Sequence, residues 1–420
     1  MFKFKKINQM DKVWIINQFA NTNDMPGHTR QYDLSLYLKN KGLSVSVFSS
    51  DFNLALRKYL KRKNNFLYGK ETINGVNWYW LKVLGYKRNN WKRYLNIISF
   101  DINLFICMFL KCFLGIFLNS KPSLIIASSP QLPAAFCSFL IAKLFRIPFI
   151  LEVRDLWPRV LLDIKNYKTK SFYIKLLFFM ENVLYKHSNL VVVLSKGCIP
   201  YVKSRGAKEV IYLPNGPDLR IFKYADLPEE SDSFSKERPF KIVYSGAHGL
   251  VNGLKNVIDA ARLLYDLPIK FYLIGDGQEK DNLIKYASDI NSIIFKDPIS
   301  HGEMPEFLSK FDAILVSLSD IKLFRYGVSP NKLYDAYALG RPVITTIPGI
   351  INDEVLKYNV GVTSKAESPI DLAMSIKSLF KLTREDRKKM SINSRMLAEK
   401  NYSRNIICQK YYQIIKNNIY

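Results

Sequence analysis

Short apolar runs alternate with helical stretches along most of the chain, and this alternation constrains the fold more than any other feature. The first series of expected strands comprises residues 13–16, 43–49, 124–127, 149–153 and 190–194. The second series comprises residues 241–244, 269–274, 292–295, 313–316 and 342–345. Strands that alternate with helices pair in parallel through right-handed crossovers. The sequence therefore predicts an α/β protein built on parallel sheets.

The chain has 420 residues, which is too many for one hydrophobic core and indicates two domains of roughly 200 residues. Between the two series, residues 226–239 are polar and charged, as in a linker or a surface excursion. We therefore expect two Rossmann-like domains, 1–215 and 216–403, that face each other across a central cleft. Ligands of such sheets bind at the carboxyl ends of the strands.

Positive charge is concentrated in the first half of the chain. Residues 1–210 carry 33 Lys and Arg against 11 Asp and Glu, a net charge of +22, whereas residues 211–420 have a net charge of +4. This asymmetry predicts an anionic partner for the first domain, such as nucleic acid, an acidic membrane surface or a phosphorylated substrate. Because no zinc, helix-turn-helix or RNA-binding aromatic signature accompanies the charge, we expect no nucleic acid partner.

Residues 57–93 are rich in Lys and Arg and lead into an apolar segment, 94–118. Asp101 and Lys111 interrupt that segment, and each charge would cost about 2.5–3.5 kcal/mol at the centre of a bilayer, which argues against a spanning helix. Basic residues beside Trp and Tyr fit an anionic membrane interface, so residues 57–93 are the better membrane candidate. For residues 100–118 we favour a buried helix of an α/β domain.

The five Cys residues have no Cys-x-x-Cys spacing and lie in apolar or helical surroundings. They are typical of reduced core residues in a cytosolic protein rather than of a disulfide framework or a metal site. The apolar run that follows the basic N-terminus is too short for a signal peptide. We therefore expect a cytoplasmic protein.

Glycine-rich loops follow several of the predicted strands. Three glycines between residues 246 and 253 allow the backbone to approach a ligand closely, and a helix expected at 254–265 would point its N-terminus at that ligand. The spacing is not Gly-x-Gly-x-x-Gly, so it does not indicate a dinucleotide site. For Gly275-Asp276-Gly277 and Pro26-Gly27-His28-x-Arg30 we favour structural turns, and loops that bind a ligand are the alternative.

A helix expected to begin at Ser329-Pro330 and to end at Gly340 is the candidate anion site. Pro in the first turn loses no hydrogen bond, and a helix N-terminus offers N–H groups and positive potential to an anion. Asp335 follows Pro330 by five residues and could accept hydrogen bonds from sugar hydroxyls next to a bound phosphate. The pattern fits a nucleotide-sugar site, and the alternative is an ordinary amphipathic helix with a solvated Asp.

Three charged residues, Glu152, Arg154 and Asp155, end a strand that is otherwise apolar. Charged groups at the end of a buried strand need partners, so they form either an internal ion-pair network or a reactive centre. We favour the reactive or substrate-facing alternative.

Several blocks, in this order along the chain, resemble the family 4 glycosyltransferases: Leu194-Ser195-Lys196, residues 213–218, Tyr244-Ser245-Gly246, residues 274–277 and residues 329–343. The ordered set covers most of the chain and is more specific than any single block. Residues 154–158 and 329–333 resemble a branch typified by N-acetylfucosaminyl transferases of bacterial O-antigen and capsule pathways. The resemblance implies the GT-B fold, whose C-terminal helix, 404–420 here, returns to the first domain.

The resemblance also implies roles for single residues. Asp335 matches the second acid of the family's Glu-x7-Glu motif, which binds the donor ribose, whereas Gly327 stands in place of the first acid. The family's phosphate-binding Arg is missing after Gly246, and Lys332 and Arg30 are the candidate substitutes. Asp155 falls near the acceptor-side catalytic position. The predicted sets are Glu152, Arg154 and Asp155 for catalysis, Gly27 and Arg30 for the acceptor or phosphate loop, and Gly246, His248, Asn252, Gly275, Gly277, Ser329, Asn331, Lys332 and Asp335 for the donor.

The implied reaction is glycosyl transfer with retained anomeric configuration, moving a hexose or N-acetylhexosamine from a UDP-sugar or another nucleotide-diphosphate sugar. The implied acceptor is a saccharide linked to polyprenyl diphosphate, in bacterial O-antigen, lipopolysaccharide or capsule biosynthesis. No Asp-x-Asp triplet occurs, so we expect no metal or other cofactor, and cationic side chains and helix N-termini would stabilise the leaving group. A lipid-linked acceptor would explain the basic first domain, which we expect at the inner face of the plasma membrane.

Two alternatives remain open. A nucleotide-sugar epimerase can share this architecture and would turn over the donor without an acceptor. A non-catalytic glycosyltransferase-like protein would bind the nucleotide only, and the missing first acid at Gly327 keeps this alternative open.

Overall fold

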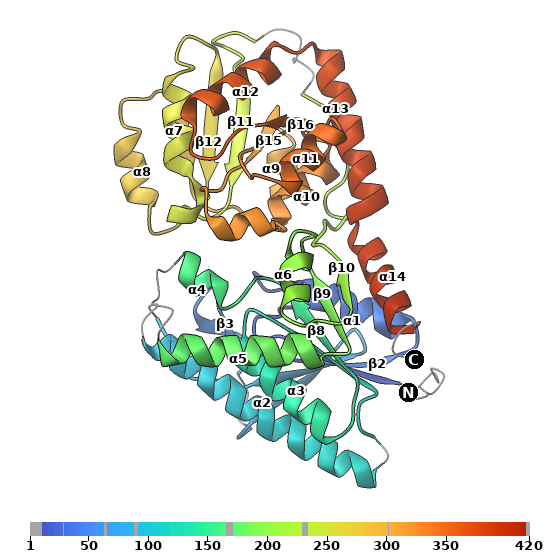
Figure 1. The fold of residues 1–420 in the computed structure, drawn as a ribbon. Helices are drawn as coiled ribbons and strands as arrows, with labels where there is room; N and C mark the ends of the chain where they lie inside the picture. Colours follow the sequence, from blue (N-terminus) through green and yellow to red (C-terminus); the bar gives the residue numbers. More distant parts are fainter. Residues whose placement is uncertain are drawn as a thin grey trace. The chain divides into compact units, whose positions relative to one another are not determined.

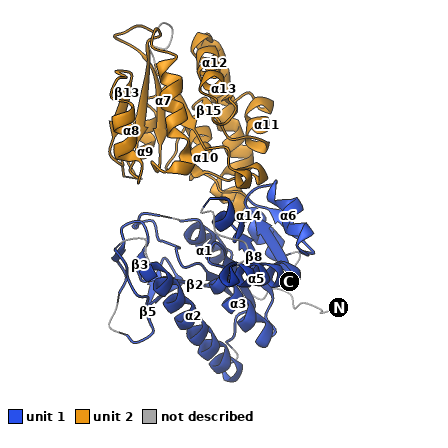
Figure 2. Ribbon diagram, turned by 60° about the vertical axis from the view of Figure 1, so that its left-hand side comes forward, with its two compact units in different colours: residues 1–213, 408–420 blue, residues 214–407 orange. Residues whose placement is uncertain are grey.

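The computed structural model of the chain describes residues 11–27, 29–62, 65–87, 91–118, 120–164, 171–228, 234–300 and 302–416. They form two compact units, residues 1–213 with 408–420 and residues 214–407, which Figure 2 distinguishes by colour. Each unit is a largely parallel sheet with helices packed on both faces (Figure 1). The predicted α/β fold with two Rossmann-like domains is confirmed.

The first unit is built on an eight-stranded sheet in the order β10-β9-β8-β7-β1-β2-β6-β5. Neighbouring strands are parallel, except that β5 runs antiparallel to β6. The strands are β1 (Lys12–Ile16), β2 (Ser44–Ser50), β5 (Tyr68–Ile73), β6 (Val76–Leu81), β7 (Leu124–Ser128), β8 (Phe149–Val153), β9 (Leu190–Val193) and β10 (Val210–Tyr212). A small antiparallel pair, β3 (Phe52–Asn53) and β4 (Lys58–Tyr59), stands apart from this sheet.

Seven helices belong wholly or partly to this unit as described: α1 (Arg30–Asn40), α2 (Trp91–Phe117), α3 (Leu132–Leu144), α4 (Arg159–Asp163), α5 (Phe172–His187), α6 (Cys198–Ser204) and the end of α14 (Arg404–Ile414). Helices α2, α3 and α5 pack side by side on one face of the sheet (Figures 1 and 2). The strand order reverses at β1, which has β2 on one side and β7 on the other. Such a reversal is the place where ligands bind at the carboxyl ends of parallel strands.

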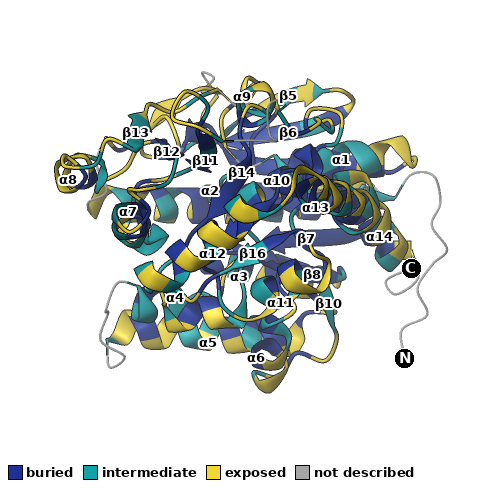
Figure 3. Ribbon diagram, turned by 90° about the horizontal axis from the view of Figure 1, so that it is seen from above, coloured by how far each residue is buried: buried dark blue, intermediate teal, exposed yellow. Residues whose placement is uncertain are grey.

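The second unit has a six-stranded, wholly parallel sheet in the order β13-β12-β11-β14-β15-β16, which reverses between β11 and β14. The strands are β11 (Phe240–Ser245), β12 (Ile269–Ile274), β13 (Ile293–Lys296), β14 (Ala313–Val316), β15 (Val343–Thr345) and β16 (Gly361–Thr363). The helices are η1 (Leu250–Asn252), α7 (Leu254–Arg262), α8 (Lys280–Tyr286), α9 (Met304–Leu308), η2 (Lys322–Tyr326), α10 (Asn331–Leu339), α11 (Ile350–Lys357), α12 (Pro369–Lys381), α13 (Arg384–Leu397) and η3 (Ala398–Tyr402). Buried apolar clusters lie on both faces of the sheet, since Ile242 and Tyr244 belong to one cluster and Val243 to the other. The strands of the sheet are buried, as their dark colour in Figure 3 shows.

The central part of residues 57–93 is a core strand and not a membrane surface, whereas the assignment of the basic ends of this segment stays a prediction. Trp78 and Trp80 lie in β6, which pairs with both β2 and β5, and their stacked rings are fully buried with centroids 4.9 Å apart. The side chain of Lys61 lies 3.5 Å from Asp24, and Arg62 donates to Asp51 over 2.9 Å. In the central part the rings of Trp78 and Trp80 fill the core, whereas Tyr59 and Trp91, beside the basic runs at the two ends, are exposed. Residues 63–64 and 88–90 lie outside the described part of the chain.

Helix α2 occupies most of the apolar segment 94–118. Within the described residues it is the one helix long and apolar enough to cross a membrane, judged by length and composition. Its inner face packs against β6 and α3, where Phe100, Leu104 and Met108 are fully buried. The expectation of a buried helix is confirmed for that face. It is wrong for the opposite face, where apolar side chains such as Ile102 and Leu110 are exposed.

Asp101 lies on the buried face of α2, and one of its carboxylate oxygens has no hydrogen-bond partner among the described residues. Burial raises the pKa of Asp101 from 3.8 to about 8. Between these two pH values the folded protein holds a proton that the unfolded chain releases. The free energy of unfolding therefore falls as the pH rises from about 4 to about 8.

We expect Asp101→Asn, which resembles the protonated side chain, to stabilise the protein at pH 9 by a few kcal/mol, since each pKa unit corresponds to about 1.4 kcal/mol. Near pH 4 the folded Asp101 carries the proton and the unfolded one carries it about half the time, so the variant and the wild type should unfold nearly alike. Thermal unfolding of both proteins from pH 4 to pH 9 checks this expectation. An equal offset at every pH would contradict it.

Candidate functional site

The carboxyl ends of β11 and β12 carry two glycine loops that touch each other. Gly275 has a φ of +144°, and a Cβ atom there would collide with the carbonyl oxygen of Gly246. A Cβ atom at Gly277 would likewise collide with the backbone of His248. Two backbone bonds join the loops, since Gly246 N–H donates to Ile274 and His248 N–H to Asp276, both over 2.9 Å. The close approach therefore requires glycine at positions 275 and 277.

Lys332, in the first turn of α10, reaches this pair of loops. Its ammonium nitrogen lies 3.9 Å from the ring centroid of Tyr244 and would be 2.9 Å from a Cβ atom at Gly246. Burial lowers the pKa of Lys332 to about 7. The structure thus brings together Lys332, Gly246 and Gly275, three of the predicted donor-binding residues, from separate elements of the second unit.

The start of α10 is fixed by Ser329. Its hydroxyl oxygen accepts a hydrogen bond from Asn215 N–H over 2.9 Å, and its carbonyl oxygen accepts one from the Asn215 side chain over 2.8 Å. Pro330 is the N-cap residue, and the cap makes no side-chain hydrogen bond to the first N–H groups of the helix. Asn331, the first helical residue, is exposed. Such a terminus can accept an anion. The Ser329 side chain itself holds the loop that enters the helix.

Asp335 follows Lys332 by one turn on the same face of α10. The side chain is partly exposed, and within the described residues its carboxylate makes no hydrogen bond or ion pair. Burial raises the pKa of Asp335 to about 7, although the positive charge of Arg404 opposes this change. The carboxylate is therefore free to accept hydrogen bonds from a ligand bound at the start of α10.

His248 and Asn252 lie in the loop between β11 and α7. The imidazole of His248 is fully buried between the rings of Tyr244 and Phe295, and neither ring nitrogen has a partner among the described residues. Burial lowers the pKa of His248, so the ring is neutral under the loop. Asn252 is half-buried in η1. His248 thus supports the loop from below and does not present its ring at the surface.

In the first unit, Glu152 at the end of β8 is the centre of a buried network. Its carboxylate accepts hydrogen bonds from Arg30 Nε over 3.0 Å and from Gln31 and Ser128 over 3.1 Å each. Arg30 also donates to the carbonyl oxygen of Leu213 over 3.0 Å. The geometry favours an internal ion-pair network for Glu152 and Arg30, and the predicted role of Arg30 in phosphate binding finds no support in these contacts.

Arg154 and Asp155 follow directly. Arg154 Nη1 donates to the side chain of Gln31 over 3.4 Å, whereas Asp155 is exposed. Of the three predicted catalytic residues, Asp155 is the exposed one, whereas Glu152 is buried and Arg154 half-buried. Gly27 has a φ of +127°, and a Cβ atom there would collide with the side chain of Asn21, so packing alone explains this glycine. His28 lies outside the described residues.

Two residues with clear roles in these clusters were not predicted. Tyr244 supports the ammonium of Lys332 with its ring and donates its hydroxyl to the carbonyl oxygen of Ala247 over 2.8 Å. Gln31 is buried and connects Glu152 to Arg154. In the sequence, the signals that could have indicated them are that Tyr244 directly precedes Ser245-Gly246 and that Gln31 directly follows Arg30.

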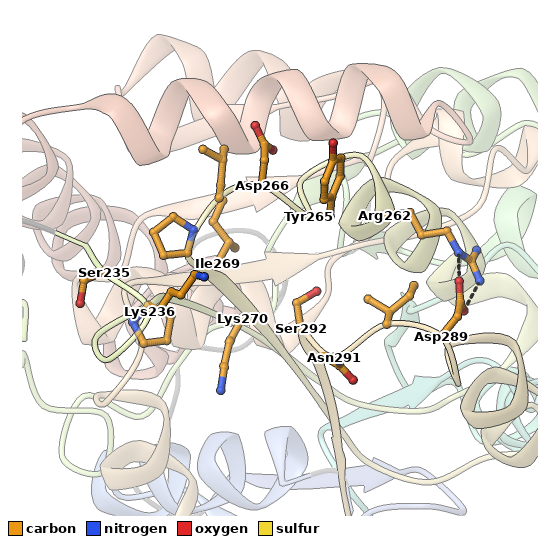
Figure 4. Close-up of a pocket in the computed structure, with 14 residues that line it drawn as sticks. Ser235, Lys236, Arg262, Tyr265, Asp266, Ile269, Lys270, Asp289, Asn291 and Ser292 are labelled. Carbon is orange, nitrogen blue, oxygen red and sulfur yellow. Dashed lines mark hydrogen bonds and ion pairs between the residues drawn. The ribbon is translucent and has the colours of Figure 1, made fainter.

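A cavity of about 770 Å³ lies at the opposite end of the second sheet (Figure 4). Its lining includes Pro239 and Ile269, at the amino ends of β11 and β12, and an ion pair in which Arg262 contacts Asp289 over 2.9 Å. The cavity is therefore separate from the candidate site. In the described part of the chain, no group of three His, Cys, Asp or Glu side chains could hold a metal ion.

Comparison with known proteins shows similarity to glycosyltransferases. Residues 228–396 match the sequence model of the family described as "Glycosyl transferases group 1". The chain is 31% identical over 150 residues to the putative colanic acid biosynthesis glycosyl transferase WcaI of Escherichia coli (strain K12), and 22% identical over 274 residues to the probable glycosyltransferase WbjE of Pseudomonas aeruginosa. These matches cover 34% and 63% of this chain, and 36% and 66% of the relatives. The chain thus spans about a third of the length of the first relative and just under two thirds of the second.

Two solved structures are similar over almost the whole chain. Sucrose-phosphate synthase (tll1590) from Thermosynechococcus elongatus superposes with a TM-score of 0.70 at 14% identity, covering 97% of this chain and 98% of the other. Anabaena Alr3699/HepE, solved in complex with UDP-glucose, superposes with a TM-score of 0.65 at 14% identity, covering 96% and 99%. At this identity the likeness concerns the fold. The chain has the GT-B fold, and residues 228–396, which lie within its second unit, match the sequence model of the glycosyl transferases group 1 family.

Proposed function

We propose that this protein is a retaining glycosyltransferase that uses a nucleotide-diphosphate sugar. The observation that carries the proposal is the position of the Lys332 ammonium beside the touching loops of Gly246 and Gly275, at the carboxyl ends of parallel strands. In this arrangement the pyrophosphate of the donor lies between Lys332 and the first N–H groups of α10. The carboxylate of Asp335 accepts hydrogen bonds from the ribose hydroxyls.

The leaving group of this reaction is a nucleoside diphosphate, whose negative charge grows as the glycosidic bond breaks. Lys332 and the N-terminus of α10 stabilise that charge, since fixed dipoles and cations need no reorganisation during the reaction. Both belong to the protein, so we propose a reaction without a metal ion or other cofactor. The UDP-glucose bound to Anabaena Alr3699/HepE supports a nucleotide-sugar donor, and UDP is the nucleotide we propose for this chain.

For the acceptor we propose a saccharide linked to polyprenyl diphosphate, at the cytoplasmic face of the membrane. The name of the relative WcaI, which refers to colanic acid biosynthesis, supports a role in bacterial surface polysaccharides, of which O-antigen and capsule are the classes we propose. The net charge of +22 in residues 1–210 suits a diphosphate-bearing acceptor. Asp155, the exposed carboxylate after β8, is the proposed group that orients or deprotonates the acceptor hydroxyl.

Replacing Lys332 tests the donor site. Lys332→Gln should weaken UDP binding by about 10- to 100-fold, the usual effect of losing a charged hydrogen bond. In the protein without ligand the pKa of Lys332 is about 7, so at pH 8 most of the molecules have a neutral Lys332. Binding of the UDP diphosphate favours the charged ammonium, so the wild type should take up a proton on binding at pH 8. Its affinity for UDP should therefore fall as the pH rises from 6.5 to 8.5. Calorimetry in buffers of different ionisation enthalpy measures this uptake.

The control for this experiment is Lys377→Gln, which removes an exposed lysine from α12. It should bind UDP as the wild type does and retain the proton uptake. Equal affinity of Lys332→Gln and the wild type would refute the pyrophosphate assignment.

We expect Asp335→Asn to weaken UDP binding, because the amide replaces a charged acceptor of the ribose hydroxyls. The loss should be smaller for the corresponding 2′,3′-dideoxy nucleotide, which lacks the hydroxyls that Asp335 would bind. Titration calorimetry with both nucleotides measures the difference. Unchanged UDP affinity of the variant would rule out the ribose assignment.

Glu152→Gln should affect mainly stability, whereas Asp155→Asn should affect mainly sugar transfer. Glu152→Gln leaves Arg30 buried beside a neutral partner, so it should lower the free energy of unfolding by about 3 kcal/mol. Asp155→Asn changes an exposed side chain, so stability should change by less than about 0.5 kcal/mol while sugar transfer is lost. Denaturant unfolding and a transfer assay, with the donor chosen by thermal shift against nucleotide sugars, separate the two. Full transfer by Asp155→Asn would exclude it from catalysis.

A further inference from the structure

The outward face of α2 is apolar along its whole length. At least a third of the surface is exposed for each of Leu95, Ile98, Ile102, Phe105, Ile106, Leu110, Phe113, Leu114, Ile116 and Phe117. The polar residues lie on the other side, where Asn96 and Asp101 are buried. The side chain of Lys111 lies against the rings of Tyr68 and Tyr79, 5.0 and 4.1 Å from their centroids. A helix that faces water has the reverse distribution.

The apolar surface continues across the two neighbouring helices. Exposed apolar side chains on them are Leu140 and Leu144 of α3 and Phe172, Tyr173, Leu176 and Phe179 of α5. Ring contacts connect the three helices, since Phe109 meets Phe145 just after α3, Phe136 meets Phe179, and Tyr94 meets Tyr173. Helices α2, α3 and α5 thus present one surface, which we call the apolar face (Figure 1).

The apolar face is larger than a soluble protein normally exposes. With large apolar side chains of about 200 Å² each, the exposed portions sum to on the order of 1,000 Å². The largest apolar patch on a typical monomer is about 300–600 Å². A surface of this size indicates an apolar partner.

The exposed charged side chains of these three helices have one sign. On α2, α3 and α5 the exposed charged side chains are Lys92, Lys143, Lys175 and Lys186, each within the first or last turns of its helix. The two acidic residues of these helices are buried, Asp101 on α2 and Glu181 on α5, where Glu181 accepts a hydrogen bond from Tyr201 over 3.0 Å. The face therefore combines an apolar centre with a basic rim, which complements anionic headgroups over acyl chains.

This charge pattern favours a bilayer over a second copy of the chain, because two basic rims would repel each other across an interface between copies. The packing also favours a helix that lies along the membrane. The inner face of α2 is held against β6 and α3, with Leu104, Met108 and Cys112 fully buried. A spanning orientation would remove these side chains from the core of the unit.

We infer that the apolar face docks on an anionic lipid bilayer, with the outward side chains of α2 and the exposed residues of α3 and α5 inserted among the acyl chains. The inference rests on the proposed function for its purpose, since the lipid-linked acceptor would lie in that bilayer. It replaces residues 57–93 as the membrane-binding segment. It also makes the binding mainly hydrophobic, with charge in a secondary role.

The test is co-sedimentation of the full chain with vesicles of phosphatidylcholine and phosphatidylglycerol at 0.1 and 1 M NaCl. The variant Ile102→Gln, Leu110→Gln, Phe117→Gln removes three exposed side chains of α2 and leaves the buried face unchanged. The control variant Leu356→Gln, Ile370→Gln, Met374→Gln removes three equally exposed side chains of the second unit. Circular dichroism checks that both variants are folded.

We expect the wild type and the control to keep their vesicle partitioning within about two-fold between the two salt concentrations. The α2 variant should lose at least ten-fold of its partitioning at 1 M NaCl. Full release of the wild type by 1 M NaCl, or undiminished binding of the α2 variant, would overturn the inference. A third outcome would also overturn it: the wild type does not bind vesicles but forms dimers, and the α2 variant is monomeric. A second copy of the chain would then cover the apolar face.

UDP binding, measured without vesicles, separates this inference from the proposed function. The α2 variant should bind UDP as the wild type does. If the wild type does not bind UDP, the donor site is refuted and the docking result still stands. If the wild type binds UDP but not vesicles, the docking alone is refuted.

Discussion

The contact between the loops of Gly246 and Gly275 is the constraint on which the second unit depends. Parallel pairing of β11 and β12 places these loops side by side, and the absence of a Cβ atom at position 275 lets the two backbones meet. Main-chain atoms of the two loops therefore lie beside the ring of Tyr244, and the ammonium of Lys332 lies over that ring. Any larger residue at position 275 would separate the loops and displace the one cation that α10 brings to them.

The second unit also departs from the family 4 pattern, which it resembles, in how it provides charge. By the resemblance, Gly327 stands in place of the first acid of the Glu-x7-Glu motif and Ala247 in place of the phosphate-binding arginine. A neutral residue at each position removes one negative and one positive charge together, so the balance around a bound diphosphate is nearly unchanged. The remaining pair, Lys332 and Asp335, lies one helical turn apart, with both pKa values moved toward neutrality by burial. A ligand that carries negative charge and hydroxyl groups would stabilise the charged form of both.

The sequence predicted ten of the strands and the glycine loops that follow β11 and β12, because buried parallel strands are continuous apolar runs and glycines mark their ends. It did not predict β5, β6, β10 and β16. It could not predict the roles of Glu152 and Arg30, which are 122 positions apart and meet only through the order of strands in the sheet. It misassigned Trp78 and Trp80 because a core strand and a membrane interface share a composition. The exposure of α2 was missed because a helix with apolar residues on both sides looks buried, and only the packing reveals which side is covered.

The apolar face has a consequence for how such a molecule would meet its substrate. A protein held flat on a bilayer searches for lipid-linked partners by lateral diffusion in two dimensions, so each encounter keeps both molecules at the same depth and within a narrow range of orientations. Weak intrinsic affinity for the acceptor is then sufficient, because confinement to a thin layer raises its effective concentration. The rate of polymer growth would then follow the fluidity and composition of the membrane as well as the supply of activated sugar.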